Sequence, residues 1–208
     1  MSYRIINPDV RTLEELVKSY DQGGAVRLDL GCGYYKKNGF IGLDNFYGAD
    51  SQRKTETGPD IEIDLMANPI PFNDGTVDEI FCSHYLEHVD IGQMLGEIYR
   101  VLKPTGALQV VLPYAISSQG LYPGHTSFYT EQWFFENKYF SDRFNLYSIG
   151  WRKTKVYDSI PIQWKPPFDI AKSIMFNVCD EFTFCCTPRK DGAPPPPDLV
   201  KEFVYEAS

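Results

Sequence analysis

The chain has 208 residues, about the size of one domain at ~150 residues per domain. Hydrophobic residues make up 43% and charged residues 23%, ordinary globular values that exclude a wholly disordered or fibrous protein. The formal charge of −8 argues against a dedicated surface for nucleic acids or anionic membranes, which needs clustered lysines and arginines. No apolar run approaches the ~20 residues of a membrane span.

The five cysteines and the N-terminal residues bear on the compartment of the chain. An odd number of cysteines without a Cys-x-x-Cys pair favours free, mostly buried thiols over a disulfide framework. The N-terminal residues contain no uninterrupted apolar stretch of the kind found in secretory signals. We therefore expect a cytoplasmic protein without a membrane anchor.

The N-terminal half is predicted to begin with a short helix and to continue as a series of strands. Thr12 and Glu15 have the spacing of a capping box, which predicts a helix from residue 12 to about residue 20. Short apolar runs bounded by turn residues predict strands at 25–30, 40–43, 61–65 and 77–82. The polar residues 45–60 predict a loop.

The most regular helix is predicted to begin after Asp90. Its apolar side chains form one stripe at helical spacing: Ile91, Met94, Leu95, Ile98 and Leu102. Residues 103–106 are predicted to end it in a turn. The remaining elements are expected as a strand at 107–112, a helix at 130–139 and strands at 143–157 and 181–187. Helices alternating with continuously apolar strands predict an α/β domain with a mostly parallel sheet.

Residues 1–190 are predicted to form a single domain. Within it, the proline- and aromatic-rich residues 158–179 resemble an insertion before the last strand and are a candidate lid. Residues 191–208 contain four consecutive prolines and predict an extended C-terminal tail with a semi-rigid spacer. This tail is either a poorly fixed terminus or an arm that crosses to a second subunit. An arm of this kind would be compatible with a homodimer.

The first predicted strand runs into the turn Asp29-Leu30-Gly31-Cys32-Gly33. Glycines at this place let backbone N–H groups approach a bound molecule closely. Asp44 closes the second strand, where its carboxylate can accept hydrogen bonds from a ribose diol, each worth ~1.5–3 kcal/mol. In a parallel sheet both features lie at the carboxyl ends of neighbouring strands, where such folds bind ligands.

The spacing of these residues disfavours a dinucleotide site and with it an NAD-type oxidoreductase. Such a site has the pattern G-x-G-x-x-G, a full helix and an acidic residue ~20 positions later. In this chain Lys36 occupies the place of the third glycine, and Asp44 follows Gly31 by only 13 residues. Residues 31–39 are too few for a turn and a helix of ordinary length.

Four motifs over residues 25–113 together resemble a known family. They are VRLDLGCG, then FIGLDN, then IEIDL followed by PIPFNDGTVDEIFCSHYLEHV, and finally EIYRVLKPTGALQVVLP. In this order they resemble the class I S-adenosylmethionine-dependent methyltransferases. The resemblance implies a Rossmann-like, doubly wound α/β fold with a mostly parallel seven-stranded sheet and helices on both faces. It also implies S-adenosyl-L-methionine as the cofactor.

The resemblance implies roles for the residues of the first two motifs. Asp29, Gly31 and Gly33 match the glycine motif that faces the methionine part of the cofactor. Asp44 matches the acid that binds the ribose.

The later motifs supply the remaining cofactor contacts that the resemblance implies. Asp64 and Leu65 match the position that reads the adenine, through a carboxylate and a backbone N–H. Ser83 and His84 follow the fourth strand, whose end typically meets the methionine ammonium group. His88 comes shortly after them and is commonly near the same pocket.

The first helix departs from the family pattern. Tyr35 stands where a third glycine is usual, and only residues 34–38 remain of the helix, as in a shortened subgroup of the family. How the methionine carboxylate is held therefore stays open. Lys36 or Lys37 could pair with it directly, and two solvated surface lysines are the alternative.

The three histidines are the candidate bases. Methyl transfer from a sulfonium is a direct displacement, in which the protein aligns the acceptor, excludes water and removes a proton from a hydroxyl acceptor. His125 lies in the long loop at 113–130, which faces the acceptor in folds of this type, and is the predicted base or acceptor contact. A surface histidine is the alternative. His84 and His88 have no obvious third ligand nearby in the sequence, so no metal site is predicted.

The leading interpretation is an enzyme that transfers a methyl group to an oxygen or nitrogen of a small-molecule acceptor, such as a sugar or another metabolite. Nucleic acid is disfavoured as a partner by the negative charge. A non-catalytic methyltransferase-like binding or partner subunit is the alternative, motivated by the missing third glycine and the proline-rich tail. Four aromatic residues could cap the acceptor pocket or fill the edge of the core: Trp151, Tyr157, Trp164 and Phe168.

Overall fold

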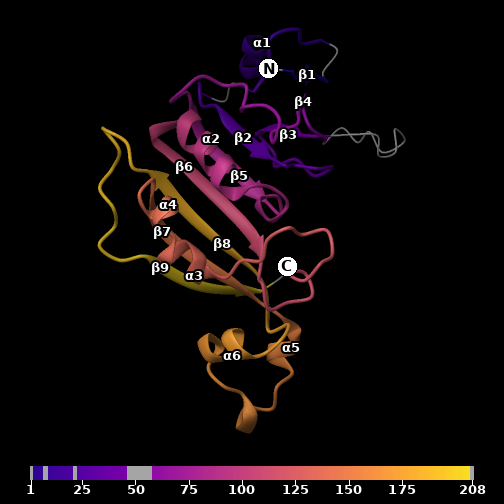
Figure 1. Cartoon of the computed structure of the whole chain (residues 1–208), viewed down its shortest axis with the longest axis vertical. Helices are drawn as coiled ribbons and strands as arrows, with labels where there is room; N and C mark the ends of the chain where they lie inside the picture. The colour runs from indigo at the N-terminus through magenta and orange to yellow at the C-terminus, as the bar shows by residue number, and fades with distance from the viewer. Residues whose placement is uncertain (1, 7–8, 21–22, 46–57, 207–208) are drawn as a thin grey trace.

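The computed structural model of the chain describes residues 2–6, 9–20, 23–45 and 58–206. The strands of this part of the chain are β1 (Arg4–Ile5), β2 (Arg27–Leu30), β3 (Ile41–Asp44), β4 (Ile61–Glu62), β5 (Val77–Ser83), β6 (Leu102–Pro113), β7 (Phe144–Lys153), β8 (Cys179–Pro188) and β9 (Lys201–Glu206). All nine belong to one sheet with the order β1-β4-β3-β2-β5-β6-β8-β7-β9 (Figure 1).

The five central strands of the sheet, β4, β3, β2, β5 and β6, are parallel. From β2 the chain first adds β3 and β4 on one side and then crosses to add β5 and β6 on the other. The strand order therefore reverses between β2 and β5. In open α/β sheets the crevice outside the carboxyl ends at such a reversal is the usual ligand site. The predicted α/β architecture is confirmed.

The central strands bury one face of the sheet completely, and their fully buried side chains lie at alternate positions along each strand. Fully buried side chains come from each of β2, β5 and β6: Leu28, Leu30, Ile80, Cys82, Leu108 and Val110. These residues belong to one core cluster that extends to β3 and β8. The carboxyl ends of β2 and β5 are consequently rigid supports for the polar residues that follow them.

The helices are α1 (Leu13–Ser19), α2 (Ile91–Val101), α3 (Glu131–Glu136), α4 (Lys138–Ser141), α5 (Lys155–Asp158) and α6 (Phe168–Ile174), with single 3₁₀ turns η2 (Leu86–His88) and η3 (Ile162–Trp164). None of these described helices has the length and apolar character needed to cross a membrane. The capping box of α1 is confirmed, since Thr12 Oγ1 accepts the N–H of Glu15 and the Glu15 carboxylate accepts the N–H of Thr12. Asp90 caps α2 as predicted, by accepting the N–H of Gln93 at 2.9 Å.

Several predicted boundaries are corrected by the structure. No turn separates α2 from the next strand, because β6 begins at Leu102, directly after α2. The helix expected at 130–139 is divided at Asn137, whose side chain caps α4 by accepting the N–H of Phe140. The strand expected from residue 143 to 157 ends at Lys153, and α5 follows it. The loop expected at 45–60 lies mostly outside the described residues.

The sheet has nine strands where seven were expected, because two short segments add to its edges. β1 pairs antiparallel with β4, and β9 pairs parallel with β7. β9 lies within residues 191–208, so part of the predicted tail returns to the domain. An exposed strand edge offers unpaired N–H and C=O groups that such a segment can pair with. Gly150 of β7 permits the close approach, because an added Cβ would lie 2.3 Å from the ring of Phe203.

Residues 155–174 project from the end of the sheet between β7 and β8 as α5, η3 and α6 (Figure 1). The four aromatic residues considered as a pocket cap are divided between two environments. Trp151 is buried in the sheet under Lys172, whose Nζ lies 4.0 Å from the indole centroid. Tyr157 and Phe168 pack on each other inside the projection, whereas Trp164 is 75% exposed. That the projection acts as a lid stays a prediction.

Candidate functional site

The glycine turn after β2 is held against the end of β3. Gly31 and Gly33 have φ values of +68° and +54°, in the left-handed region that favours glycine. The N–H of Gly31 donates to the carbonyl of Leu43, and the N–H of Gly33 donates to Asp44 Oδ2, both at 2.8 Å. The turn therefore unites three of the predicted cofactor residues, Gly31, Gly33 and Asp44, in one hydrogen-bonded unit.

The two glycines of the turn differ in their surroundings, which yields a testable prediction. A Cβ at Gly31 would lie 2.4 Å from the ring of Tyr85, whereas a Cβ at Gly33 would meet nothing within 4 Å. Gly33→Ala is expected to cost only the strain of a left-handed alanine, roughly 1–2 kcal/mol. Gly31→Ala adds a clash with a packed ring and is expected to cost about 2 kcal/mol more. Urea unfolding of both variants measures the difference, and equal destabilisation would contradict the clash.

Asp29 is the buried acid of this site, with 2% of its surface exposed. Its Oδ2 accepts the N–H of Lys37 at 2.6 Å, which ties the shortened connection after the turn back to β2. Burial disfavours the charged carboxylate and raises the pKa of Asp29 to about 6. Because the folded protein holds the proton of Asp29 more tightly than the unfolded chain does, its stability falls as the pH rises through this range.

This pKa predicts how Asp29→Asn changes the pH dependence of stability. Between the unfolded pKa of ~3.9 and the folded value, the folded state binds more protons than the unfolded state, so wild-type stability falls as pH rises. A pKa difference of about 2 is worth ~3 kcal/mol, of which about 1–1.5 kcal/mol is lost between pH 5 and 7.5. The free energy of unfolding of Asp29→Asn, measured with urea relative to the wild type, should therefore rise by about 1–1.5 kcal/mol from pH 5 to pH 7.5. A difference that does not change with pH would show that Asp29 is not responsible.

Asp64 and Leu65, the residues predicted to read the adenine, lie just after β4. Asp64 Oδ1 accepts the N–H groups of Met66 and Ala67 at 2.9 and 3.3 Å, so the residue forms its own turn. This turn ends the strand that was expected to reach residue 65. Leu65 is buried, with 3% of its surface exposed.

Both lysines of the shortened connection have partners. Lys36 Nζ lies 2.9 Å from both carboxylate oxygens of Asp60 and also contacts the hydroxyl of Tyr20. Lys37 Nζ donates to Gln109 Oε1 at 3.1 Å and lies over the ring of Phe81 at 4.1 Å. Neither lysine is therefore a solvated surface side chain. Asp60, which the sequence analysis did not single out, neutralises the charge of Lys36.

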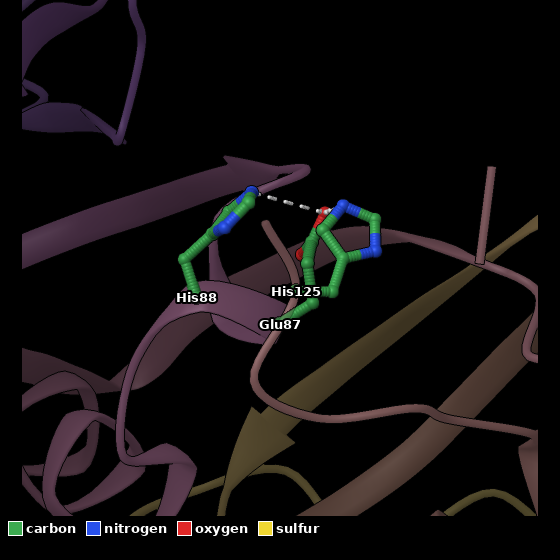
Figure 2. Close-up of side chains that lie close together, drawn as sticks. All are labelled: Glu87, His88 and His125. Atoms are coloured by element: carbon green, nitrogen blue, oxygen red, sulfur yellow. Dashed lines mark ion pairs between the residues drawn. The ribbon is translucent and has the colours of Figure 1, made fainter. Parts of the chain in front are cut away.

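A second polar cluster surrounds Glu87, in the 3₁₀ turn η2 that follows β5. Glu87 is fully buried, and among the described residues neither of its carboxylate oxygens has a hydrogen-bond partner. All three histidines approach its Oε1: His84 Nδ1 at 3.6 Å, His88 Nε2 at 3.9 Å and His125 Nε2 at 3.8 Å. Figure 2 shows the side chains of His88 and His125 on either side of this carboxylate.

The loop that carries His125 is attached directly to η2. The main-chain carbonyl of Glu87 accepts the N–H and the hydroxyl of Thr126, both at 2.9 Å, and the N–H of Ser127 at 3.2 Å. The rings of His88 and His125 consequently pack edge to face with centroids 4.8 Å apart. His125 is largely buried, with 8% of its side chain exposed, so the alternative of a surface histidine is wrong.

His84 occupies a different position in the cluster. It directly follows Ser83, the last residue of β5, and has a left-handed φ of +52°. Its Nε2 lies 3.2 Å from Glu181 of β8, and the hydrogen bond with Glu181 and the nearby carboxylate of Glu87 raise the pKa of His84 to about 9. The imidazole is therefore charged at neutral pH and unsuited to act as a base.

Sequence reasoning missed Glu87, although the residue stands beside His88 in the quoted motif. Its burial was not foreseeable, because a glutamate in a polar turn is normally exposed. The structure thus divides the predicted site residues into three places: the glycine turn with Asp44, the turn of Asp64, and the cluster of the histidines around Glu87. The described contacts of His84 and His88 are with this cluster, and their role toward the cofactor stays a prediction.

Comparison with known proteins adds the following findings. Residues 28–110 match the family model described as a methyltransferase domain. A comparison with curated protein sequences gives no match. Among solved structures, a SAM-dependent methyltransferase from Archaeoglobus fulgidus is similar, with a TM-score of 0.54 and 16% identity over 82% of this chain and 89% of that chain.

Two further solved structures share the fold. The [4+2]-cyclase SpnF matches with a TM-score of 0.51 and 16% identity over 84% of this chain and 80% of that chain. The Haemonchus contortus phosphoethanolamine N-methyltransferase 2, solved with S-adenosylhomocysteine, matches with a TM-score of 0.51 and 13% identity over 80% of this chain and 49% of that chain. At these identities the similarity shows the fold alone.

Proposed function

Because residues 28–110 are a class I methyltransferase domain that uses S-adenosyl-L-methionine, we propose that this enzyme methylates an oxygen or nitrogen of a small molecule, such as a sugar or another metabolite. The observation that carries the proposal is the contact between the two polar sites. The ring of Tyr85, two residues before Glu87, packs against Gly31 of the glycine turn. A methyl group held at that turn would therefore lie close to the histidine cluster.

For the cofactor we propose the contacts that the family resemblance implies. Asp29, Gly31 and Gly33 would face the methionine part, and Asp44 the ribose. The geometry supports the role of Asp44, because its carboxylate is already oriented toward the turn by the N–H of Gly33.

The adenine and the methionine ammonium group would be bound further along the sheet. Asp64 and Leu65 would read the adenine, and this is supported by the geometry of the turn, in which Oδ2 of Asp64 is not used by the N–H groups of Met66 and Ala67. Ser83, His84 and His88 would line the ammonium end of the pocket.

We propose that His125 acts on the acceptor. Its Nδ1 lies 3.0 Å from the carbonyl oxygen of Gly120, which can only accept a hydrogen bond, so Nδ1 carries a proton and in the neutral imidazole Nε2 has the lone pair. A lone pair held in place in this way can take the proton of a hydroxyl or amine acceptor as the methyl group is transferred.

A small-molecule acceptor is favoured over a nucleic acid because the clustered basic residues Arg152 and Lys153 are already paired with acidic side chains. Arg152 forms ion pairs with Asp180 and Glu181, and Lys153 pairs with Asp158 and Glu206. This basic cluster is therefore neutralised within the chain and offers little attraction to phosphates. A cytoplasmic location is supported by the cysteines, all five of which are free. Whether the enzyme forms a homodimer is left to a measurement of mass in solution.

A calorimetric titration with S-adenosylhomocysteine tests the cofactor part of this proposal, with NAD as the control. Micromolar binding of the first ligand alone is expected. The alternative is a non-catalytic binding subunit that keeps the fold. It is tested by incubating the protein with labelled S-adenosylmethionine and a metabolite extract. Label transferred to a small molecule would reject the alternative, and cofactor binding without any transfer would support it.

A further inference from the structure

The carboxylate of Glu87 has an unusual environment for a charged group. It is fully buried, and within the described part of the chain both oxygens lack a hydrogen bond. Burying an ionised carboxylate is costly unless the charge is paired or bound to a metal. The groups that face it are the three imidazoles, each more than 3.5 Å from Oε1. The carboxylate thus has imidazoles at ion-pair distance and no hydrogen bond, and a nitrogen atom of each of the three imidazoles lies 3.6–3.9 Å from Oε1.

The orientation of two imidazoles indicates what would occupy this centre. His88 Nδ1 lies 3.1 Å from the carbonyl oxygen of Gly124, and His125 Nδ1 lies 3.0 Å from that of Gly120. Both Nδ1 atoms therefore carry a proton, and in the neutral imidazole the lone pair is on Nε2, which lies on the side of Glu87. Histidines that ligate metals almost always donate their other N–H to such a carbonyl or carboxylate, which fixes the ring orientation.

We propose that Glu87, His88 and His125 bind a divalent first-row transition metal ion such as Zn²⁺. The ligand atoms would be a carboxylate oxygen of Glu87 and Nε2 of both histidines, and the candidate atoms all lie within 4.8 Å of one another. Two imidazoles and one carboxylate form a known set for catalytic zinc, with the fourth position left open. In a tetrahedral site the ligand atoms are ~3.3 Å apart, given bonds of 2.0–2.1 Å. The observed separations from Oε1 are about half an ångström wider, which small side-chain rotations would close.

His84 is the third imidazole near Glu87, and we do not count it as a ligand. Its Nε2 is engaged by Glu181, which in turn binds Arg152 and the hydroxyl of Tyr205. These contacts keep His84 on the side of β8, away from the two free Nε2 atoms. The site therefore consists of three side chains from two segments, η2 and the loop that contains His125.

The consequence for the reaction rests on the proposed function, whereas metal binding does not. A divalent cation at this place would bind a hydroxyl of the acceptor and lower its pKa, so that the oxygen loses its proton to solvent water. The oxygen would then take the methyl group from the sulfonium, and S-adenosylhomocysteine would leave. In the metal-loaded protein Nε2 of His125 would be a ligand, and the cation would replace it as the group that activates the acceptor. The preferred acceptor would then carry an oxygen that can bind the metal.

The test uses the full chain, stripped with a chelator and titrated with Zn²⁺ in a calorimeter. One ion per chain is expected for the wild type, with Co²⁺ giving the visible absorption of a protein-bound ion. Glu87→Gln and His125→Gln should each weaken Zn²⁺ binding by about a hundredfold or more. Glu136→Gln, at an exposed glutamate of α3, is the matched control and should bind Zn²⁺ within a few-fold of the wild type. Circular dichroism checks that each variant is folded, and the two ligand variants keep the test valid if one of them unfolds.

The outcomes separate this proposal from the proposed function. Equal Zn²⁺ affinity of the wild type and both ligand variants, or no binding by the wild type, would overturn the metal site. If S-adenosylhomocysteine still binds to the same sample, the methyltransferase proposal stands without it. Zn²⁺ binding that depends on Glu87 and His125 in a protein that transfers no methyl group would instead support the metal site and count against the proposed function.

Discussion

Methyl transfer is expected to slow by about 10²–10⁴-fold when His125 is replaced by alanine, the range over which a positioned acid or base acts. In the proposed function Nε2 of His125 takes the proton of the acceptor, and the hydrogen bond from Nδ1 to the carbonyl of Gly120 orients the ring. Alanine removes the group and leaves the adjacent bonds of Thr126 to Glu87 in place. The rate is measured as transfer of labelled methyl groups into small molecules of a metabolite extract, at saturating cofactor.

The control for this variant is its affinity for S-adenosylhomocysteine, which should equal that of the wild type because the change lies outside residues 28–110. Treatment with a chelator distinguishes whether His125 acts as a base or as a metal ligand. A metal-free wild-type enzyme that keeps its rate indicates a base, and one that falls to the rate of the variant indicates a ligand. Turnover of the variant at the wild-type rate would remove His125 from both roles.

Cofactor affinity is expected to fall at least tenfold in Asp44→Ala, a loss of ~1.4 kcal/mol or more. Each charge-assisted hydrogen bond from a ribose hydroxyl is worth ~1.5–3 kcal/mol, so the loss of two bonds would approach a thousandfold. Asp44 also accepts the N–H of Gly33, so its removal loosens the turn that would face the methionine part. Calorimetric titration with S-adenosylhomocysteine measures the effect.

Two further variants make this test specific. Asp44→Asn keeps an acceptor for Gly33 but removes the charge, and it should fall between the wild type and Asp44→Ala. Asp142→Ala removes a half-exposed carboxylate of similar size next to α4 and should leave the affinity unchanged. An affinity of Asp44→Ala within two-fold of the wild type would exclude Asp44 from ribose binding.

Prediction from the sequence succeeded for elements whose signals are local. The capping box of α1, the apolar stripe of α2 and the apolar runs of β2, β3 and β5 each lie within a few consecutive residues. It failed where partners come from a distance. β9 forms only because the edge of β7 accepts it. The division of α3 from α4 is the exception, since the contact of Asn137 with Phe140 is local and its capping signal was overlooked.

The candidate site shows the same division. Its glycine turn and Asp44 could be identified from the sequence because strand, turn and strand follow one another within residues 27–44, and parallel pairing brings their ends together. The partners of Lys36 and Lys37 could not be identified from the sequence. Asp60 directly precedes β4 and Gln109 lies in β6, so both are distant from the lysines along the chain.

The sequence by itself determined the α/β architecture, the methyltransferase resemblance, the cofactor class and the residues of the glycine turn. Only the tertiary structure decided that Glu87 is buried, that all three histidines face it, and that two of them direct Nε2 toward its carboxylate. The burial of Glu87 could not be predicted because a glutamate in a turn becomes buried only when another segment of the chain packs over it. In this protein the loop of His125 does so, by donating three hydrogen bonds to the carbonyl of Glu87 from residues 39 and 40 positions away.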